Sequence, residues 1–87
     1  MDRTLTASAL KELISMGEGL SLEFKRSVTH LGRELCAFAN SGGGRILIGV
    51  NDDGSVAGVG DINRVKSEIQ NMARSMEPSL MVDFDLI

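Results

Sequence analysis

Tryptophan and tyrosine are absent from this 87-residue sequence, and phenylalanine occurs only three times. Proteins that hold single-stranded nucleic acid by base stacking use aromatic side chains as the platform. That mode of binding is therefore excluded. The phenylalanines fall on the predicted core faces of strands and helices, and we expect all three in the core: Phe24, Phe38 and Phe84.

Cysteine and long apolar runs are also scarce. The single Cys36 cannot form an internal disulfide, so we expect a reducing, cytoplasmic setting. No apolar run approaches the roughly 20 residues that a membrane helix needs, and no basic segment precedes an apolar one at the N-terminus. We therefore expect no membrane partner. With 43% hydrophobic and 24% charged residues, residues 1–87 are expected to form one small globular domain.

Net positive charge is absent as well, since the formal charge is −3. The charge is nevertheless uneven. Residues 24–45 hold four cations against one acid, a local +3, whereas residues 51–87 hold seven acids against three cations, a local −4. One interpretation is ordinary scattered surface charge. The other is a basic face that contacts the phosphates of a nucleic acid, formed by Lys25, Arg26, Arg33 and Arg45.

Hydrophobic periodicity predicts the element order αβαββαβ, an α+β domain with a mixed sheet packed by helices. Helices are predicted from Thr6 or Ser8 to Gly17, over 29–40, and from a cap at Asp61 to about 76; strands are predicted over 20–25, 45–50, 56–59 and 80–86. The strand over 45–50 is nearly all apolar, which is typical of burial on both faces. The chain ends inside the last apolar strand, so we expect either a piece of a larger protein or a neighbouring strand supplied from elsewhere.

The first predicted strand has two different faces. Leu20, Leu22 and Phe24 alternate on an apolar face, and Glu23 and Lys25 then lie on the opposite, wet face. Strand interiors are usually poor in glutamate and lysine. The pair is either an exposed ion pair of little energetic value or part of a site.

A site is indicated when Glu23 is considered with Glu18 and Asp52, because the three carboxylates can converge at one end of the sheet. Carboxylate oxygens are the ligands that Mg²⁺ and Mn²⁺ prefer. Such a metal would activate water or stabilise phosphoryl oxygens, and Lys25 would then steady the charge of a phosphate. Glu18, Glu23 and Asp52 are thus candidate metal ligands and catalytic residues of a nuclease.

Three consecutive glycines, Gly42–Gly44, look at first like a phosphate cradle. They follow a predicted helix and precede a strand, whereas P-loops and dinucleotide folds have the reverse order, which turns a helix N-terminus to the anion. The lysine of a Walker motif is also missing. The glycines therefore indicate a helix end, and an ATPase is not supported.

Several blocks occur together in an ordered set that resembles the Schlafen/AlbA-like domain family. The resemblance covers roughly residues 10–78. Its blocks are Glu18-(x4)-Glu23-Phe24-Lys25, Ala37-Phe38-Ala39-Asn40-Ser41-x-Gly43-Gly44, Leu47-Ile48-Gly49-Val50-x-Asp52-x-Gly54 and Val59-Gly60.

The resemblance implies an α+β module, generally DNA-binding, that forms the N-terminal part of a larger transcriptional regulator. In the animal Schlafen branch it implies an endoribonuclease of structured RNA, with an acidic site that corresponds here to Glu18, Glu23 and Asp52. The chain ends before the last strands of the family domain, so we expect an incomplete module. The Schlafen nuclease also uses two lobes, and a homodimer would supply the second.

Three functions are thus open. The first is nucleic-acid binding through phosphate contacts, with DNA favoured over RNA, no required cofactor, and C-terminal domains of the parent protein as partners. Because no helix rich in base-reading side chains is apparent, we expect sequence specificity to come from another domain. The second is a nuclease that depends on Mg²⁺ or Mn²⁺. The third is a structural or dimerisation module.

Overall fold

The structure is a computed structural model that describes residues 6–76 and 81–87. Across these residues the elements follow the order αβαβα. They are α1 (Ala7–Met16), β1 (Leu22–Lys25), α2 (Leu31–Asn40), β2 (Arg45–Ile48) and α3 (Ile62–Arg74). A small domain of helices around one parallel sheet is consistent with the predicted α+β class.

The ends of two helices follow the predicted capping chemistry. The Thr6 side chain accepts a hydrogen bond from the Ala9 N–H at 3.1 Å, and Gly17, with φ +77°, ends α1. Asp61 accepts from the Arg64 N–H at 3.0 Å and begins α3. Each such cap replaces a hydrogen bond that the first helical turn lacks and stabilises a helix by about 1 kcal/mol.

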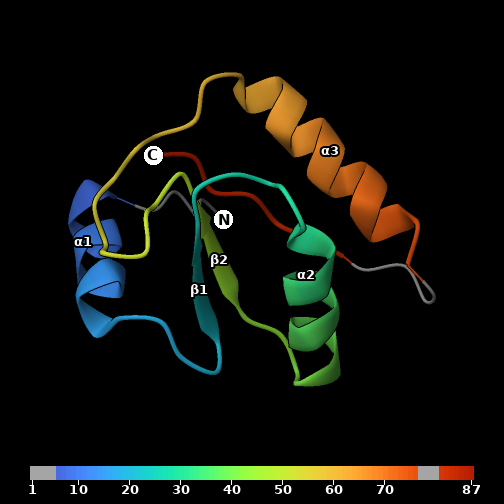
Figure 1. Ribbon diagram of the computed structural model, residues 1–87, viewed down its shortest axis with the longest axis horizontal. Helices are drawn as coiled ribbons and strands as arrows, with labels where there is room; N and C mark the ends of the chain where they lie inside the picture. The colour runs from blue at the N-terminus through green and yellow to red at the C-terminus, as the bar shows by residue number, and fades with distance from the viewer. Residues whose placement is uncertain (1–5, 77–80) are drawn as a thin grey trace.

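The two strands run parallel, with Leu22 opposite Arg45 and Lys25 opposite Ile48. The connection between them contains α2, as a parallel pair requires. Figure 1 shows α1 on one side of the sheet and α2 with α3 on the other. The protein is therefore built in three layers, with the sheet in the middle.

A separate apolar cluster fills each side of the sheet. On the α1 side, Leu22, Phe24 and Val50 are buried and pack with residues of α1 and with Leu47. On the other side, the buried residues come from α2 and α3, and Ile46 and Ile48 pack against them; the buried set is Leu31, Leu35 and Ile69. The second strand therefore packs on both faces, but Ile46, Leu47 and Ile48 are half-buried rather than buried as predicted.

Two predicted strands are not formed. Residues 56–59 contribute only a single antiparallel bridge, between Val50 and Val56. The positive φ of Gly58, +80°, interrupts the extended backbone, and the Ala57 and Gly58 N–H groups both donate to the Gly49 carbonyl. Residues 81–87 form no strand; Val82 and Phe84 instead pack against the α2–α3 cluster. The start of that predicted strand, Leu80, lies outside the described residues. Within the described ranges the sheet is therefore a parallel pair rather than a mixed sheet.

The predicted start of the first strand is also wrong. Leu20 is 97% exposed, and β1 begins only at Leu22. The Gly19 N–H donates to the Leu22 carbonyl at 2.9 Å, and this tight turn directs Leu20 away from the core. Every helix within residues 6–76 and 81–87 is too short or too polar to span a lipid bilayer.

Candidate acidic site and nucleic-acid interface

The face of β1 that carries Glu23 and Lys25 is not a wet face. Both residues are half-buried, between the buried Leu22 and Phe24 of the opposite face. This second face is the one that α2 covers, because the neighbouring Ile46 and Ile48 pack against the α2–α3 cluster. The sequence-based expectation is corrected here: the charged residues of β1 lie between two layers.

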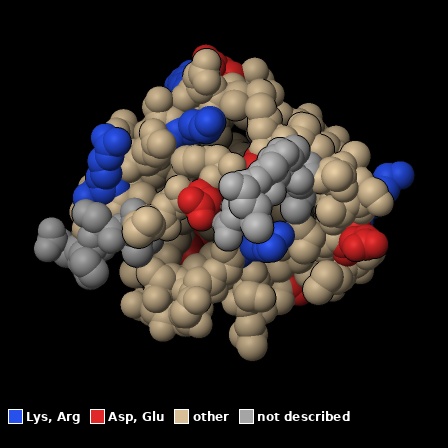
Figure 2. All heavy atoms as spheres, turned by 180° about the vertical axis from the view of Figure 1, so that it is seen from behind, with Lys and Arg blue, Asp and Glu red and all other residues tan. Residues whose placement is uncertain are grey.

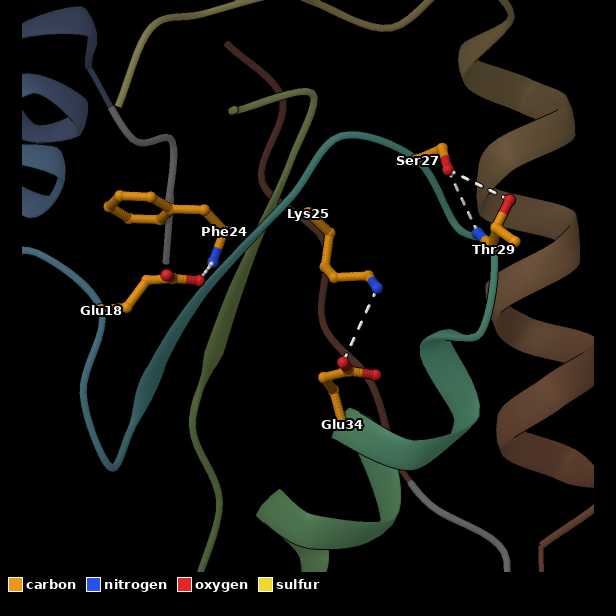
Figure 3. Close-up of polar contacts among 6 residues, drawn as sticks. All are labelled: Glu18, Phe24, Lys25, Ser27, Thr29 and Glu34. Carbon is orange, nitrogen blue, oxygen red and sulfur yellow. Dashed lines mark hydrogen bonds and ion pairs between the residues drawn. The ribbon is translucent and has the colours of Figure 1, made fainter. Parts of the chain in front are cut away.

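Lys25 finds its partner on α2. Its Nζ lies 3.6 Å from Oε1 of Glu34, and the two side chains are 21% and 25% exposed. Figure 3 shows the lysine reaching across from β1 to the first turn of α2. The other carboxylate oxygen of Glu34, Oε2, is shielded from solvent and has no hydrogen-bond partner among the described residues. Burial of such an oxygen costs free energy, because the oxygen has lost its hydrogen bonds to water without gaining another donor.

Glu34 was not among the predicted site residues. It lies in the first turn of α2, where a negative charge is stabilised by the helix dipole. Its position in the sequence, nine residues after Lys25, gives no indication of contact. Only the crossover that folds α2 back onto β1 brings the two together.

Glu18 lies at the outer edge of β1, away from β2. Its Oε2 accepts a hydrogen bond from the backbone N–H of Phe24 at 2.9 Å, as Figure 3 shows. An edge strand leaves such N–H groups without a neighbouring strand, and the Glu18 carboxylate takes the place of that neighbour. Glu18 therefore has a structural function in addition to any chemistry.

The carboxyl of Glu23 has a raised pKa compared with its ordinary value of 4.5. Burial is the main cause, followed by a hydrogen bond with the Glu18 side chain and by the negative charges of Glu18 and Glu34. The ammonium of Lys25 opposes the increase. Two of the three predicted ligands, Glu18 and Glu23, are thus side by side, and Glu34 adds a further negative charge nearby.

Asp52 occupies a different environment. It is exposed in the turn after β2, where the Gly54 N–H donates to the Asn51 carbonyl at 2.9 Å. Across residues 6–76 and 81–87, no three histidine, cysteine or acidic side chains are gathered closely enough to hold a metal ion. The site formed by Glu18, Glu23 and Asp52 remains a prediction, of which the structure brings the two glutamates together.

The four predicted cationic contacts fall into two groups. Lys25 is paired, whereas the arginines are exposed and make no ion pair with another described residue: Arg26, Arg33 and Arg45. The register places Arg45 at the start of the strands and Arg26 just after the end of β1. On the face seen in Figure 2, basic and acidic side chains are interspersed.

A family model described as Schlafen, AlbA_2 matches residues 18–87, most of the 87-residue chain. The chain belongs to the Schlafen AlbA_2 family. No solved protein structure matches it. The matched range of this Schlafen AlbA_2 domain begins at Glu18 and includes Glu23 and Asp52.

Membership of the Schlafen AlbA_2 family indicates a function related to nucleic acids. This agrees with the first two sequence-based hypotheses at the level of ligand class. Family membership is compatible with both a binding module and a nuclease, which differ in what the individual residues do.

The raised pKa of Glu23 leads to a prediction for stability. When the pKa of a carboxyl is higher in the folded than in the unfolded state, the carboxyl stabilises the fold at pH values below its unfolded-state pKa. This contribution is lost as the pH rises through the folded-state pKa. Because a glutamine side chain carries no charge, Glu23→Gln should be more stable than the wild type at pH 7 and equal to it at pH 4. The gain should stay within about 1 kcal/mol, the range for partly exposed charges.

Thermal unfolding followed by circular dichroism at the two pH values measures this difference. Glu12→Gln, which removes an exposed carboxylate on α1, is the matched control and should change stability little at either pH. A Glu23→Gln protein that is less stable than the wild type at pH 7 would contradict the repulsion from Glu18 and Glu34.

Proposed function

We propose that this Schlafen AlbA_2 chain is a nucleic-acid-binding module of a transcriptional regulator, with DNA as the preferred ligand. The observation that carries the proposal is the exposure of three arginines without ion pairs to other described residues: Arg26, Arg33 and Arg45. Arginines of this kind bind backbone phosphates and release condensed counterions. Such contacts give affinity and position without sequence readout.

Lys25 has a different part in this proposal. Its ammonium is paired with Glu34 and its side chain is only 21% exposed, so Lys25 orders the interface between β1 and α2. The phosphate contacts are assigned to the arginines. Because Arg45 lies at the opposite end of the strands from Arg26, the contacts are spread along the molecule rather than concentrated in one pocket.

Replacing the three arginines together with glutamine should weaken binding to duplex DNA by on the order of 10-fold to 100-fold at low salt. The slope of log affinity against log salt should become shallower by about 2 to 3, since each lost phosphate contact removes roughly 0.9. Fluorescence anisotropy with a labelled random-sequence duplex at several salt concentrations measures both quantities.

The control for this prediction is Lys11→Gln, which removes one exposed cation from α1 and should leave the slope nearly unchanged. An unchanged slope in the triple variant would remove the arginines from the interface. Absence of any binding at low salt would overturn the proposed function.

A second candidate is a metal-dependent endoribonuclease, and the contact between the Glu18 and Glu23 carboxyls favours it. Mg²⁺ is often held by one or two carboxylates together with waters and substrate phosphate oxygens, so this pair fits such an ion. The ion would supply Lewis-acid stabilisation of a phosphoryl oxygen. Glu34 would hold Lys25 beside the pair through the 3.6 Å contact.

This candidate predicts cleavage of transfer RNA that requires Mn²⁺ or Mg²⁺ and stops with a chelator. Glu23→Gln and Asp52→Asn should each lower the cleavage rate by on the order of 100-fold. Asp53→Asn is the neighbouring control, because Asp53 hydrogen-bonds to Ser55 within its own turn. Cleavage that survives Glu23→Gln would exclude this site. Binding of nucleic acid without cleavage would exclude the nuclease and leave only the first proposal.

A further inference from the structure

One side of α3 carries a row of uncharged polar side chains, followed at the end of the helix by Arg74. Asn63, Ser67 and Gln70 lie at positions i, i+4 and i+7, and therefore share one side of the helix. All three are exposed, while Ile69 and Ala73 on the inner side are buried. We call Asn63, Ser67 and Gln70 the outer face of α3.

The position of α3 leaves this face accessible. In Figure 1, α3 lies at the margin of the molecule and has α2 on its inner side. Its 13 residues correspond to a rod about 20 Å long. The major groove of B-form DNA is about 12 Å wide and admits an α-helix.

The charge of α3 also suits a polyanion. The helix holds three cations and one acid, a net charge of +2, in a chain whose net charge is −3. The acid, Glu68, is paired with Arg64 at 3.2 Å. Asp61, just before the helix, uses its carboxylate to cap it. The outer face itself contains no carboxylate that would repel DNA.

We propose that α3 lies in the major groove of duplex DNA and that Asn63 and Gln70 read base edges there. This inference rests on the proposed function and adds sequence preference to it. Asparagine and glutamine form paired hydrogen bonds with N6 and N7 of adenine. Seven residues of helix span about 10 Å, or roughly three base pairs. The expectation that specificity comes from another domain is thereby replaced by a reading helix within this one.

DNA is preferred to RNA by the same geometry. The major groove of A-form RNA is deep and narrow, so that side chains cannot read it. A helix with base-reading side chains on its outer face therefore fits B-form DNA, whereas phosphate contacts alone would not distinguish the two.

The test uses the full chain and a duplex selected from a random-sequence library by repeated binding. The wild type should bind the selected duplex at least about 10-fold more tightly than a scrambled one. Asn63→Ala/Gln70→Ala should lose this preference, by about fivefold to 150-fold for each paired contact, and should retain the affinity and salt slope for the scrambled duplex. Alanine favours helix more than either replaced residue, so the variant is expected to fold.

Two controls locate the contact. Asn40→Ala removes an exposed amide from α2 and should keep the preference. A selected duplex with 7-deazaadenine, which lacks the N7 acceptor of the major groove, should bind the wild type more weakly but the double variant equally well.

Binding without preference in the wild type, or a preference that the double variant keeps, would overturn the reading helix and leave the proposed function standing. An equal loss of affinity for transfer RNA in the double variant would overturn the assignment to the DNA major groove. No binding to any duplex at low salt would overturn the proposed function and this inference together.

Discussion

Leu31→Ala is expected to lower the free energy of unfolding by about 3 kcal/mol. Leu31 is 1% exposed and packs with Leu35 of α2 and Ile69 of α3. Removing its side chain therefore leaves a cavity where the second helical layer meets the sheet. In a domain of this size each kcal/mol shifts the melting temperature by about 4–8 °C, so a decrease of roughly 12–24 °C is expected.

Leu20→Ala is the matched control because it makes the same chemical change at a 97% exposed position. Its effect should stay within about 0.5 kcal/mol. Thermal and urea unfolding of the two variants gives both values. The sequence pattern placed Leu20 in the core beside Leu22 and Phe24, so similar losses in the two variants would support the sequence pattern and contradict the structure.

Gly49→Ala should destabilise the protein by about 3 kcal/mol, through backbone strain and overpacking. Gly49 has φ +89°, and a Cβ atom there would lie 2.8 Å from the carbonyl oxygen of Gly58. Its own N–H donates to the Lys25 carbonyl at 2.7 Å, and its carbonyl accepts from Ala57 at 2.7 Å and from Gly58 at 2.9 Å. Neither the strand nor the returning segment can move without losing these bonds.

Gly58→Ala separates the two causes. Gly58 also has a positive φ, +80°, but a Cβ atom there meets nothing within 4 Å. Only the strain remains, about 1–2 kcal/mol. Unfolding in urea should therefore rank the variants wild type, Gly58→Ala and Gly49→Ala. Equal losses of stability in the two variants would show that a Cβ atom at position 49 does not clash with the Gly58 carbonyl.

Gly49 also bears on the candidate site, because the turn that carries Asp52 begins directly after Val50. A displaced Gly49 would move Asp52 with respect to β1. If Asp52 acts with Glu23, Gly49→Ala should impair function more than its loss of stability explains. Activity or binding measured well below the melting temperature distinguishes the two effects.

Local features of the fold were predictable from the sequence. Thr6, Gly17 and Asp61 mark helix ends because capping depends on a few neighbouring residues, and the structure has each of them in that function. The predicted strand over 56–59 failed because a strand needs a partner as well as a pattern. Val56 makes an isolated bridge to Val50, and the Ala57 and Gly58 N–H groups both donate to the one carbonyl of Gly49 instead of continuing a ladder.

The sequence by itself determined that β1 has two chemically different faces and that Glu18, Glu23 and Asp52 occur in a family-like order. Alternation along a strand establishes this much, since it depends only on the backbone geometry of adjacent residues. It does not determine what covers each face.

The tertiary structure decided the environment of the charged residues. It placed Glu34 of α2 against Lys25 and the half-buried Glu23 beside Glu18, and it left Asp52 exposed in its turn. The contact between Lys25 and Glu34 joins β1 to α2, and its geometry depends on how α2 crosses over the sheet. Layer packing therefore decides that Lys25 meets Glu34, whereas the short turn at Gly19–Leu22 brings Glu18 to Glu23.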